Sequence, residues 1–180
     1  MIKIIMHGCN GKMGQVISQI VNEDPNAQIA AGIDIVDNRD NGYPVFTNIR
    51  ECDVQADVVI DFASAKAEDA LLDFCMERNL PVVVCTTGLS EEQIARVKET
   101  SKVVAVLKSA NMSLGVNTLL KLLQDAAKVL APAGFDMEIV EKHHKHKVDA
   151  PSGTALAMAD SMNEALEIGR ASCRERVYQL

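Results

Sequence analysis

The chain has 180 residues, of which 48% are hydrophobic and 24% charged, and its formal net charge is −7 at neutral pH. This is the composition of a globular protein, and the length accommodates one full domain and part of a second. A net negative charge opposes non-specific nucleic-acid binding, because neutralising a phosphate backbone needs a basic face, so we expect no nucleic-acid partner. No run of about 20 apolar residues is present, so we expect no membrane partner either.

The five cysteines are irregularly spaced and include no C-x-x-C pair: Cys9, Cys52, Cys75, Cys85 and Cys173. An odd, unpatterned set is typical of a reducing compartment. The first residues read directly as a strand, without the basic and apolar regions of a secretory signal. We therefore expect a cytoplasmic protein.

Short β-branched segments alternate with segments of helical period over the first part of the chain, which favours parallel strands joined by helices. Ser90 and Gln93 have the spacing of a capping box at a helix start. We predict an α/β domain over residues 1–110, with a doubly wound, Rossmann-like parallel sheet. Strands are predicted over 2–6, 28–31, 56–62, 81–85 and 103–107, and helices over 13–21 and 67–75.

The pattern changes after residue 111, where a long helix with one apolar face is predicted. A strand over 135–140 and a helix over 154–166 follow. We interpret residues 111–167 as an incomplete α+β domain for substrate binding and oligomerisation. Residues 168–180 differ in character, and we interpret them as a non-native tail that translates a sequencing-adapter read-through.

Gly8, Gly11 and Gly14 lie between the first predicted strand and the first helix. Glycines at such a turn let backbone amides approach a pyrophosphate at the positive end of the helix dipole. A plain strand-to-helix turn would explain the glycines alone, but Asp34 follows Gly14 by 20 residues at the end of the second strand. A carboxylate at that place binds the hydroxyls of an adenine ribose, so the spacing predicts a dinucleotide site.

The same carboxylate bears on the choice of cofactor between NADH and NADPH. No basic residue immediately follows Asp34, and the nearest one is Arg39. A ribose 2′-phosphate would therefore meet a negative charge without a close counter-charge. We predict that NADH is favoured.

The densest chemical signal is the basic run that begins EKHHKHK at residue 141. Histidine can donate a proton near neutral pH, and lysine is a fixed donor to a carboxylate, as reduction of a dicarboxylic acid would require. The alternatives are a solvated basic loop and a metal site at the clustered histidines. Adjacent lysines repel cations, and no cysteine or compact carboxylate set completes a ligand shell, so we predict no metal. Ser152, Gly153 and Thr154 open the next predicted helix and form either a second anion site or a simple N-cap.

Five segments in order resemble those of the dihydrodipicolinate reductase family: HGCNGKMG, DFASA, CTTGL, SANMSLGVN and EKHHKHKVDAPSGTALAMAD. The resemblance implies reduction of 4-hydroxy-tetrahydrodipicolinate to tetrahydrodipicolinate by NADH or NADPH in lysine and diaminopimelate biosynthesis. Two positions depart from the family pattern: Cys85 replaces a glycine, and Met112 replaces a phenylalanine. Both substitutions add or reshape bulk near the nicotinamide without removing a reactive group.

The resemblance also implies residue roles. His143 would be the general acid and Lys147 would assist it. The substrate dicarboxylate would be bound by His144, Ser152, Gly153 and Thr154. The cofactor would be lined by Gly8, Cys9, Asn10, Gly11, Lys12, Met13, Asp34, Cys85, Thr86, Thr87, Ser109, Ala110, Asn111 and Met112.

Two alternatives stay open. One is another two-domain reductase of the aspartate or homoserine dehydrogenase type, against which the basic run argues. The other is a truncated nucleotide-binding fragment without turnover, because sites need supporting structure that this chain would lack. The resemblance implies a homotetramer for full-length family members, and we do not extend that expectation to this chain.

Overall fold

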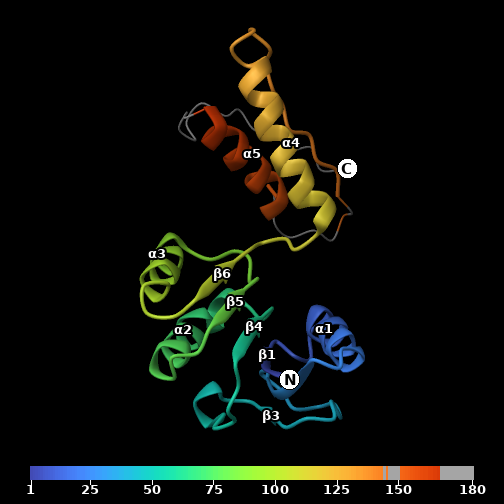
Figure 1. The fold of residues 1–180 in the computed structure, drawn as a ribbon, viewed down its shortest axis with the longest axis vertical. Helices are drawn as coiled ribbons and strands as arrows, with labels where there is room; N and C mark the ends of the chain where they lie inside the picture. Colours follow the sequence, from blue (N-terminus) through green and yellow to red (C-terminus); the bar gives the residue numbers. More distant parts are fainter. Residues whose placement is uncertain (144, 146–150, 167–180) are drawn as a thin grey trace. The chain divides into compact units, whose positions relative to one another are not determined.

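The computed structural model describes residues 1–143, 145 and 151–166, and it divides into two compact units, Met1–Ser109 and Ala110–Leu180 (Figure 1). The residues His144 and Lys147 and the tail 168–180 lie outside the described residues. Among the described residues, no helix has both the length and the apolar character needed to cross a membrane.

The first unit is built on one six-stranded parallel sheet with the strand order β3-β2-β1-β4-β5-β6. The chain winds outward from β1 in both directions, so β1 and β4 are neighbours at the point where the winding reverses. The strands are β1 (Ile2–His7), β2 (Ala27–Ile33), β3 (Val45–Phe46), β4 (Val58–Asp61), β5 (Val82–Val84) and β6 (Val106–Lys108). The helices are α1 (Lys12–Glu23), α2 (Glu68–Glu77) and α3 (Glu91–Thr100), with short 3₁₀ turns η1 (Ile49–Glu51) and η2 (Ala65–Ala67).

Both faces of the sheet are covered, with α1 on one side and α2 and α3 on the other (Figure 1). Successive side chains of β1 enter different cores because a strand alternates its faces. Ile5 packs in the core that contains Leu71 of α2, whereas Met6 packs in the core that contains Val21 of α1. This double burial explains why Ile4, Ile5 and Met6 of β1 are apolar in succession instead of alternating with polar residues.

The predicted doubly wound fold is confirmed, and so is the capping box, in which Ser90 and Gln93 satisfy each other's backbone amides. The observed strands differ from the predicted ones by a few residues at their ends. The two-residue strand β3 was missed because it is too short to show a period. It joins the sheet through pairs such as Gly32 with Val45.

The second unit contains α4 (Leu114–Leu130) and α5 (Gly153–Leu166), which pack against each other. The predicted strand over 135–140 is wrong, because these residues have no regular structure. A strand needs a partner to satisfy its backbone groups, and no described residue of this unit supplies one.

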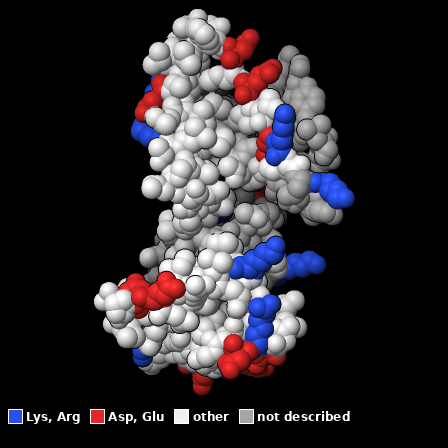
Figure 2. All heavy atoms as spheres, turned by 90° about the vertical axis from the view of Figure 1, so that its right-hand side faces the viewer, with Lys and Arg blue, Asp and Glu red and all other residues white. Residues whose placement is uncertain are grey.

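Large apolar side chains of the second unit remain exposed, including Leu114, Leu122, Val129 and Phe135. In Figure 2, residues other than Lys, Arg, Asp and Glu make up most of the described surface of this unit that faces the viewer. Leu114, Leu122 and Val129 all lie on α4, so this helix leaves part of its apolar surface uncovered.

A buried carboxylate, Glu68, begins α2 in the first unit. Its side chain is 1% exposed, and neither carboxylate oxygen has a hydrogen-bond partner among the described residues. Burial, reinforced by the nearby charge of Asp61, raises the pKa of Glu68 to about 7, while Lys108 acts in the opposite direction. Part of the population therefore carries a buried proton at neutral pH.

We predict that Glu68→Gln stabilises the first unit at pH 8 but not at pH 5. Between the unfolded pKa near 4.5 and the folded value of about 7, the folded chain retains a proton that the unfolded chain has released, so stability falls as the pH rises. The variant should remove a loss of about 1 to 3 kcal/mol. Thermal unfolding at both pH values tests this, with Glu77→Gln on the exposed end of α2 as control. Equal effects at both pH values would contradict it.

Candidate functional site

The loop between β1 and α1 requires glycine at two places. Gly8 has φ +82°, and a Cβ there would lie 2.7 Å from the carbonyl oxygen of Phe62. A Cβ on Gly14 would collide with the Gly8 carbonyl oxygen and lie 2.7 Å from the Cα of Cys9. The first turn of α1 therefore packs directly on the backbone of the loop, and the loop packs on the segment after β4.

This loop forms one wall of a cleft of about 590 Å³ at the carboxyl ends of the strands. Gly8, Asn10 and Gly11 line one side, and Ala63 and Ser64 line the side that follows β4. The cleft thus lies where β1 and β4 diverge, the place at which open parallel sheets bind ligands. Gly11 is the N-cap of α1, and no acidic side chain occupies the first turn of the helix. The helix end is therefore suited to an anion.

Asp34 lies in the same cleft, directly after β2. One carboxylate oxygen accepts the backbone N–H of Asn10 at 2.8 Å, and the other accepts the backbone N–H of Ile35 at 2.8 Å. Each carboxylate oxygen has a further lone pair for an outside donor. The carboxylate is consequently fixed in place yet can still accept two hydroxyl groups. Arg39 lines the same cleft.

The segment after Asp34 is held to the glycine loop by amide side chains. The side chain of Asn10 donates to the carbonyl oxygen of Val36 at 2.6 Å, and its own oxygen accepts from the side chain of Asn41 at 2.9 Å. The side chain of Gln15 donates to Asn41 at 2.8 Å. Sequence reasoning named Asn10 but missed Asn41, because the contact joins residues 31 apart.

A buried pair below the cleft, His7 and Asp61, was also missed. The Nδ1 atom of His7 lies 2.7 Å from Oδ1 of Asp61, and both side chains are almost fully buried. The same oxygen accepts the backbone N–H of Ala63 at 3.1 Å. The pair joins the ends of β1 and β4, so it fixes the two walls of the cleft against each other. The sequence did offer a signal for this pair, since each of the two buried strands ends in a polar residue.

The CTTGL segment follows β5 at the same edge of the sheet but does not line the cleft. Cys85 and Thr86 are buried, whereas Thr87 is exposed. Burial raises the pKa of the Cys85 thiol to about 11, and burial together with Asp34 raises that of Cys9 to about 11. Both cysteines are therefore neutral thiols at physiological pH and are not nucleophiles.

The remaining cofactor candidates fall in different places. Lys12 and Met13 begin α1 and are exposed beside the cleft loop. Ser109 follows β6 in the first unit, whereas Ala110, Asn111 and Met112 belong to the second. These residues therefore span the boundary between the units.

His143, the candidate general acid, belongs to the second unit. Its Nε2 atom lies 2.7 Å from Oε2 of Glu141. Glu141 also accepts the backbone N–H of Ser152 at 2.8 Å and its hydroxyl at 2.5 Å. These hydrogen bonds, that of the Ser152 hydroxyl foremost and that of His143 next, lower the pKa of Glu141 to about 2.

The start of α5 is therefore tied to Glu141. The Ser152 hydroxyl also accepts the backbone N–H of Ala155 at 3.1 Å, so it caps the helix while it donates to the carboxylate. Gly153 is the first residue of α5, and the hydroxyl of Thr154 accepts from the Asn111 side chain at 3.3 Å. His144 and Lys147, also candidates, lie outside the described residues.

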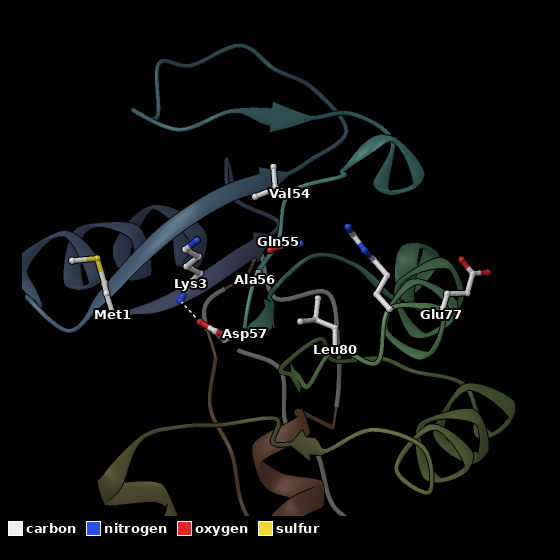
Figure 3. A pocket seen from close by; sticks show the side chains of 9 residues that line it. Met1, Lys3, Val54, Gln55, Ala56, Asp57, Glu77 and Leu80 are labelled. Carbon is white, nitrogen blue, oxygen red and sulfur yellow. Dashed lines mark hydrogen bonds between the residues drawn. The ribbon is translucent and has the colours of Figure 1, made fainter.

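A second cleft, of about 640 Å³, lies at the opposite edge of the sheet, where β1 begins (Figure 3). Its charged groups already serve the fold. The Asp57 carboxylate accepts the backbone N–H of Lys3 at 2.7 Å, and the Arg78 guanidinium donates to the carbonyl oxygens of Cys52 and Asp53. No glycine loop reaches this edge, so we do not assign the functional site to it.

The strand order, the glycine loop before α1 and the acidic residue after β2 define a Rossmann-like α/β fold of the dinucleotide-binding class. The sequence matches the family description "Dihydrodipicolinate reductase, N-terminus" over residues 2–112 and "Dihydrodipicolinate reductase, C-terminus" over residues 115–178. The chain belongs to the dihydrodipicolinate reductase family.

Individual relatives agree with this assignment. The chain is 49% identical to the 4-hydroxy-tetrahydrodipicolinate reductase of Clostridium novyi (strain NT) over 93% of its own length and 66% of the relative. It is 49% identical to that of Caldanaerobacter subterraneus subsp. tengcongensis over 99% of its own length and 68% of the relative. The chain thus spans about two thirds of the length of these relatives.

Solved structures share the fold. The dipicolinate-bound dihydrodipicolinate reductase from Paenisporosarcina sp. TG-14 has a TM-score of 0.74 at 24% identity, with coverage of 100% of this chain and 79% of that one. A probable dehydrogenase from Thermotoga maritima has a TM-score of 0.51 at 17% identity, with coverage of 78% and 44%.

We predict that Gly14→Ala destabilises the first unit, because the added methyl would be forced into the backbone of Gly8 and Cys9. The expected loss is about 1 to 3 kcal/mol in urea unfolding, the usual scale for overpacking. Gly115→Ala in α4 is the control, since its nearest neighbour would be 3.8 Å away and alanine favours a helix. Equal stability of Gly14→Ala and the parent chain would contradict the packing described.

Proposed function

We propose that this chain carries the cofactor-binding and proton-donating parts of a 4-hydroxy-tetrahydrodipicolinate reductase. The reaction would convert 4-hydroxy-tetrahydrodipicolinate and NAD(P)H with one proton into tetrahydrodipicolinate, NAD(P)⁺ and water, in lysine and diaminopimelate biosynthesis. The observation that carries the proposal is the cleft at the β1–β4 divergence, walled by the glycine loop and Asp34, in a chain of this family. A cytoplasmic location agrees with the unpaired buried cysteines.

The cleft fits a nicotinamide dinucleotide, whose reduced ring supplies the hydride. The backbone amides of residues 8–13 would receive the pyrophosphate, because Gly8 and Gly14 leave no Cβ in the way and Lys12 adds positive charge at the start of α1. Asp34 would accept the adenine ribose hydroxyls with its remaining lone pairs. The segments 85–87 and 109–112 would contact the nicotinamide end of the cofactor.

The cofactor preference would follow from two side chains of one cleft. Asp34 offers only acceptors, so it favours the 2′-hydroxyl of NADH over the 2′-phosphate of NADPH. Arg39 lines the same cleft and could pair with a 2′-phosphate. We propose that NADH binds better and that Arg39 permits a lower affinity for NADPH.

The second unit would bind the dicarboxylate and deliver the proton. His143 would protonate the substrate where the hydride leaves negative charge. The start of α5, with Gly153 and Thr154, would hold one carboxylate through backbone amides and a hydroxyl. His144 and Lys147 would complete this site, and both lie outside the described residues.

A second candidate function is nucleotide binding without turnover. One observation bears on it: the second unit exposes large apolar side chains. An apolar surface left in water costs about 25 cal/mol per Å². The family resemblance implies a homotetramer for full-length members. Such an assembly would need this apolar surface to be covered.

We predict that Asp34→Ala weakens NADH binding about tenfold while NADPH binding changes little, because only the unphosphorylated ribose gains from the carboxylate. Arg39→Ala should weaken NADPH selectively. Fluorescence titration of both cofactors measures these affinities, with the exposed neighbour Asp37→Ala as control. An equal loss of both cofactors in Asp34→Ala would refute the assignment of Asp34.

We predict that His143→Ala lowers turnover at least about a hundredfold, the usual scale for loss of a general acid, while NADH affinity is retained. The assay follows NADH oxidation with substrate generated by a coupled synthase. It compares the chain with a chimera in which the C-terminal third of the Clostridium novyi relative follows residue 167. Nucleotide binding without turnover in the chain, together with an active chimera, would favour the second candidate function.

A further inference from the structure

Glu141 stands at the head of the basic run, and its side chain is 12% exposed. From the described residues it accepts three hydrogen bonds, one from Nε2 of His143 and two from Ser152. The lysines that flank this cluster, Lys142 and Lys145, are exposed. Among the described residues, the carboxylate thus contacts the histidine and the start of α5.

The protonation state of Glu141 decides which histidine nitrogen carries a hydrogen. The hydrogen bonds from Ser152 and His143 lower the pKa of Glu141 to about 2, so the carboxylate is an acceptor only at neutral pH. Nε2 of His143 must therefore be the donor in this contact. The proton that His143 can release is then the one on Nδ1, and loss of that proton leaves a neutral ring whose Nε2–H is already hydrogen-bonded.

Ser152 makes this arrangement rigid. Its backbone N–H and hydroxyl both bind Glu141, and its hydroxyl also caps α5 through the N–H of Ala155. The carboxylate is therefore anchored to a helix terminus before it meets the histidine. A proton donor is effective only when it is held in a productive orientation, and misplacement by about 1 Å can cost a factor of a hundred.

We infer that Glu141 is a positioning residue that holds His143 in the form protonated on Nε2 and reserves Nδ1 for proton transfer to the substrate. The inference rests on the proposed function as far as proton transfer is concerned. The tautomer itself is a property of the chain and can be measured without substrate or cofactor.

The first test reads the histidine ring directly. Two-bond ¹⁵N–¹H correlation spectra of the chain at pH 8 should show His143 protonated on Nε2, with His143→Gln used to assign its signals. In Glu141→Gln the carboxamide replaces the carboxylate, and the signals should move toward the mixture of tautomers seen in free histidine. Glu138→Gln, an exposed residue of the same segment, should leave them unchanged. An Nδ1-protonated ring in the parent chain would overturn the inference.

The second test uses the chimera extended after residue 167. Glu141→Gln should lower kcat about tenfold or more while KM for the substrate and Kd for NADH stay within about twofold. Glu141→Asp, which keeps the charge, should recover part of the loss. If Glu141→Gln and Glu138→Gln have the same kcat, Glu141 has no positioning role. A thermal melt shows whether Glu141→Gln has a folding defect. If it does, the tautomer spectra of Glu141→Asp, which keeps the charge, test the positioning role in its place.

An inactive chimera with His143 protonated on Nε2 would count against the proposed function and leave the role of Glu141 in holding the ring intact. An active chimera whose His143 is protonated on Nδ1 would support the proposed function and overturn the role of Glu141 in holding the ring. The two failures are therefore distinguishable.

Discussion

The close approach of three backbone segments at the carboxyl edge of β1 is the constraint on which the first unit depends. Gly8 lies against Phe62, and Gly14 brings α1 onto Gly8 and Cys9. The buried hydrogen bond between His7 and Asp61 holds the first of these contacts from below. The cleft exists because these segments meet without side chains between them, so its geometry follows from packing that the fold itself requires.

The sequence was sufficient to predict the doubly wound sheet, because β1, β4 and β5 are short apolar runs between helical segments. It also placed Gly8 and Asp34, which the structure brings to one cleft. It could not reveal the pairing of His7 with Asp61, because their separation of 54 residues is bridged only by the topology. The strand expected over 135–140 was wrong for a related reason: alternation of apolar residues does not supply a partner strand.

The two units differ in how much of their structure they satisfy internally. In the first unit the apolar faces of β1 are both covered, and Ser90 and Gln93 satisfy the start of α3. In the second unit, Leu122 of α4 and Phe135 in the segment after it remain exposed. The ordered cluster of Glu141, His143 and Ser152 is consequently maintained by polar contacts and a helix cap more than by a hydrophobic core.

The burial of Cys9 has a consequence for experiments on the nucleotide loop. Its side chain is 0% exposed and its pKa of about 11 leaves almost no thiolate, so alkylating reagents and oxidants cannot reach a reactive sulfur while the loop is closed. Modification of Cys9 therefore requires the loop to leave α1. When modification is measured at Cys9 itself, separately from the other cysteines, its rate reports how often the cleft wall opens.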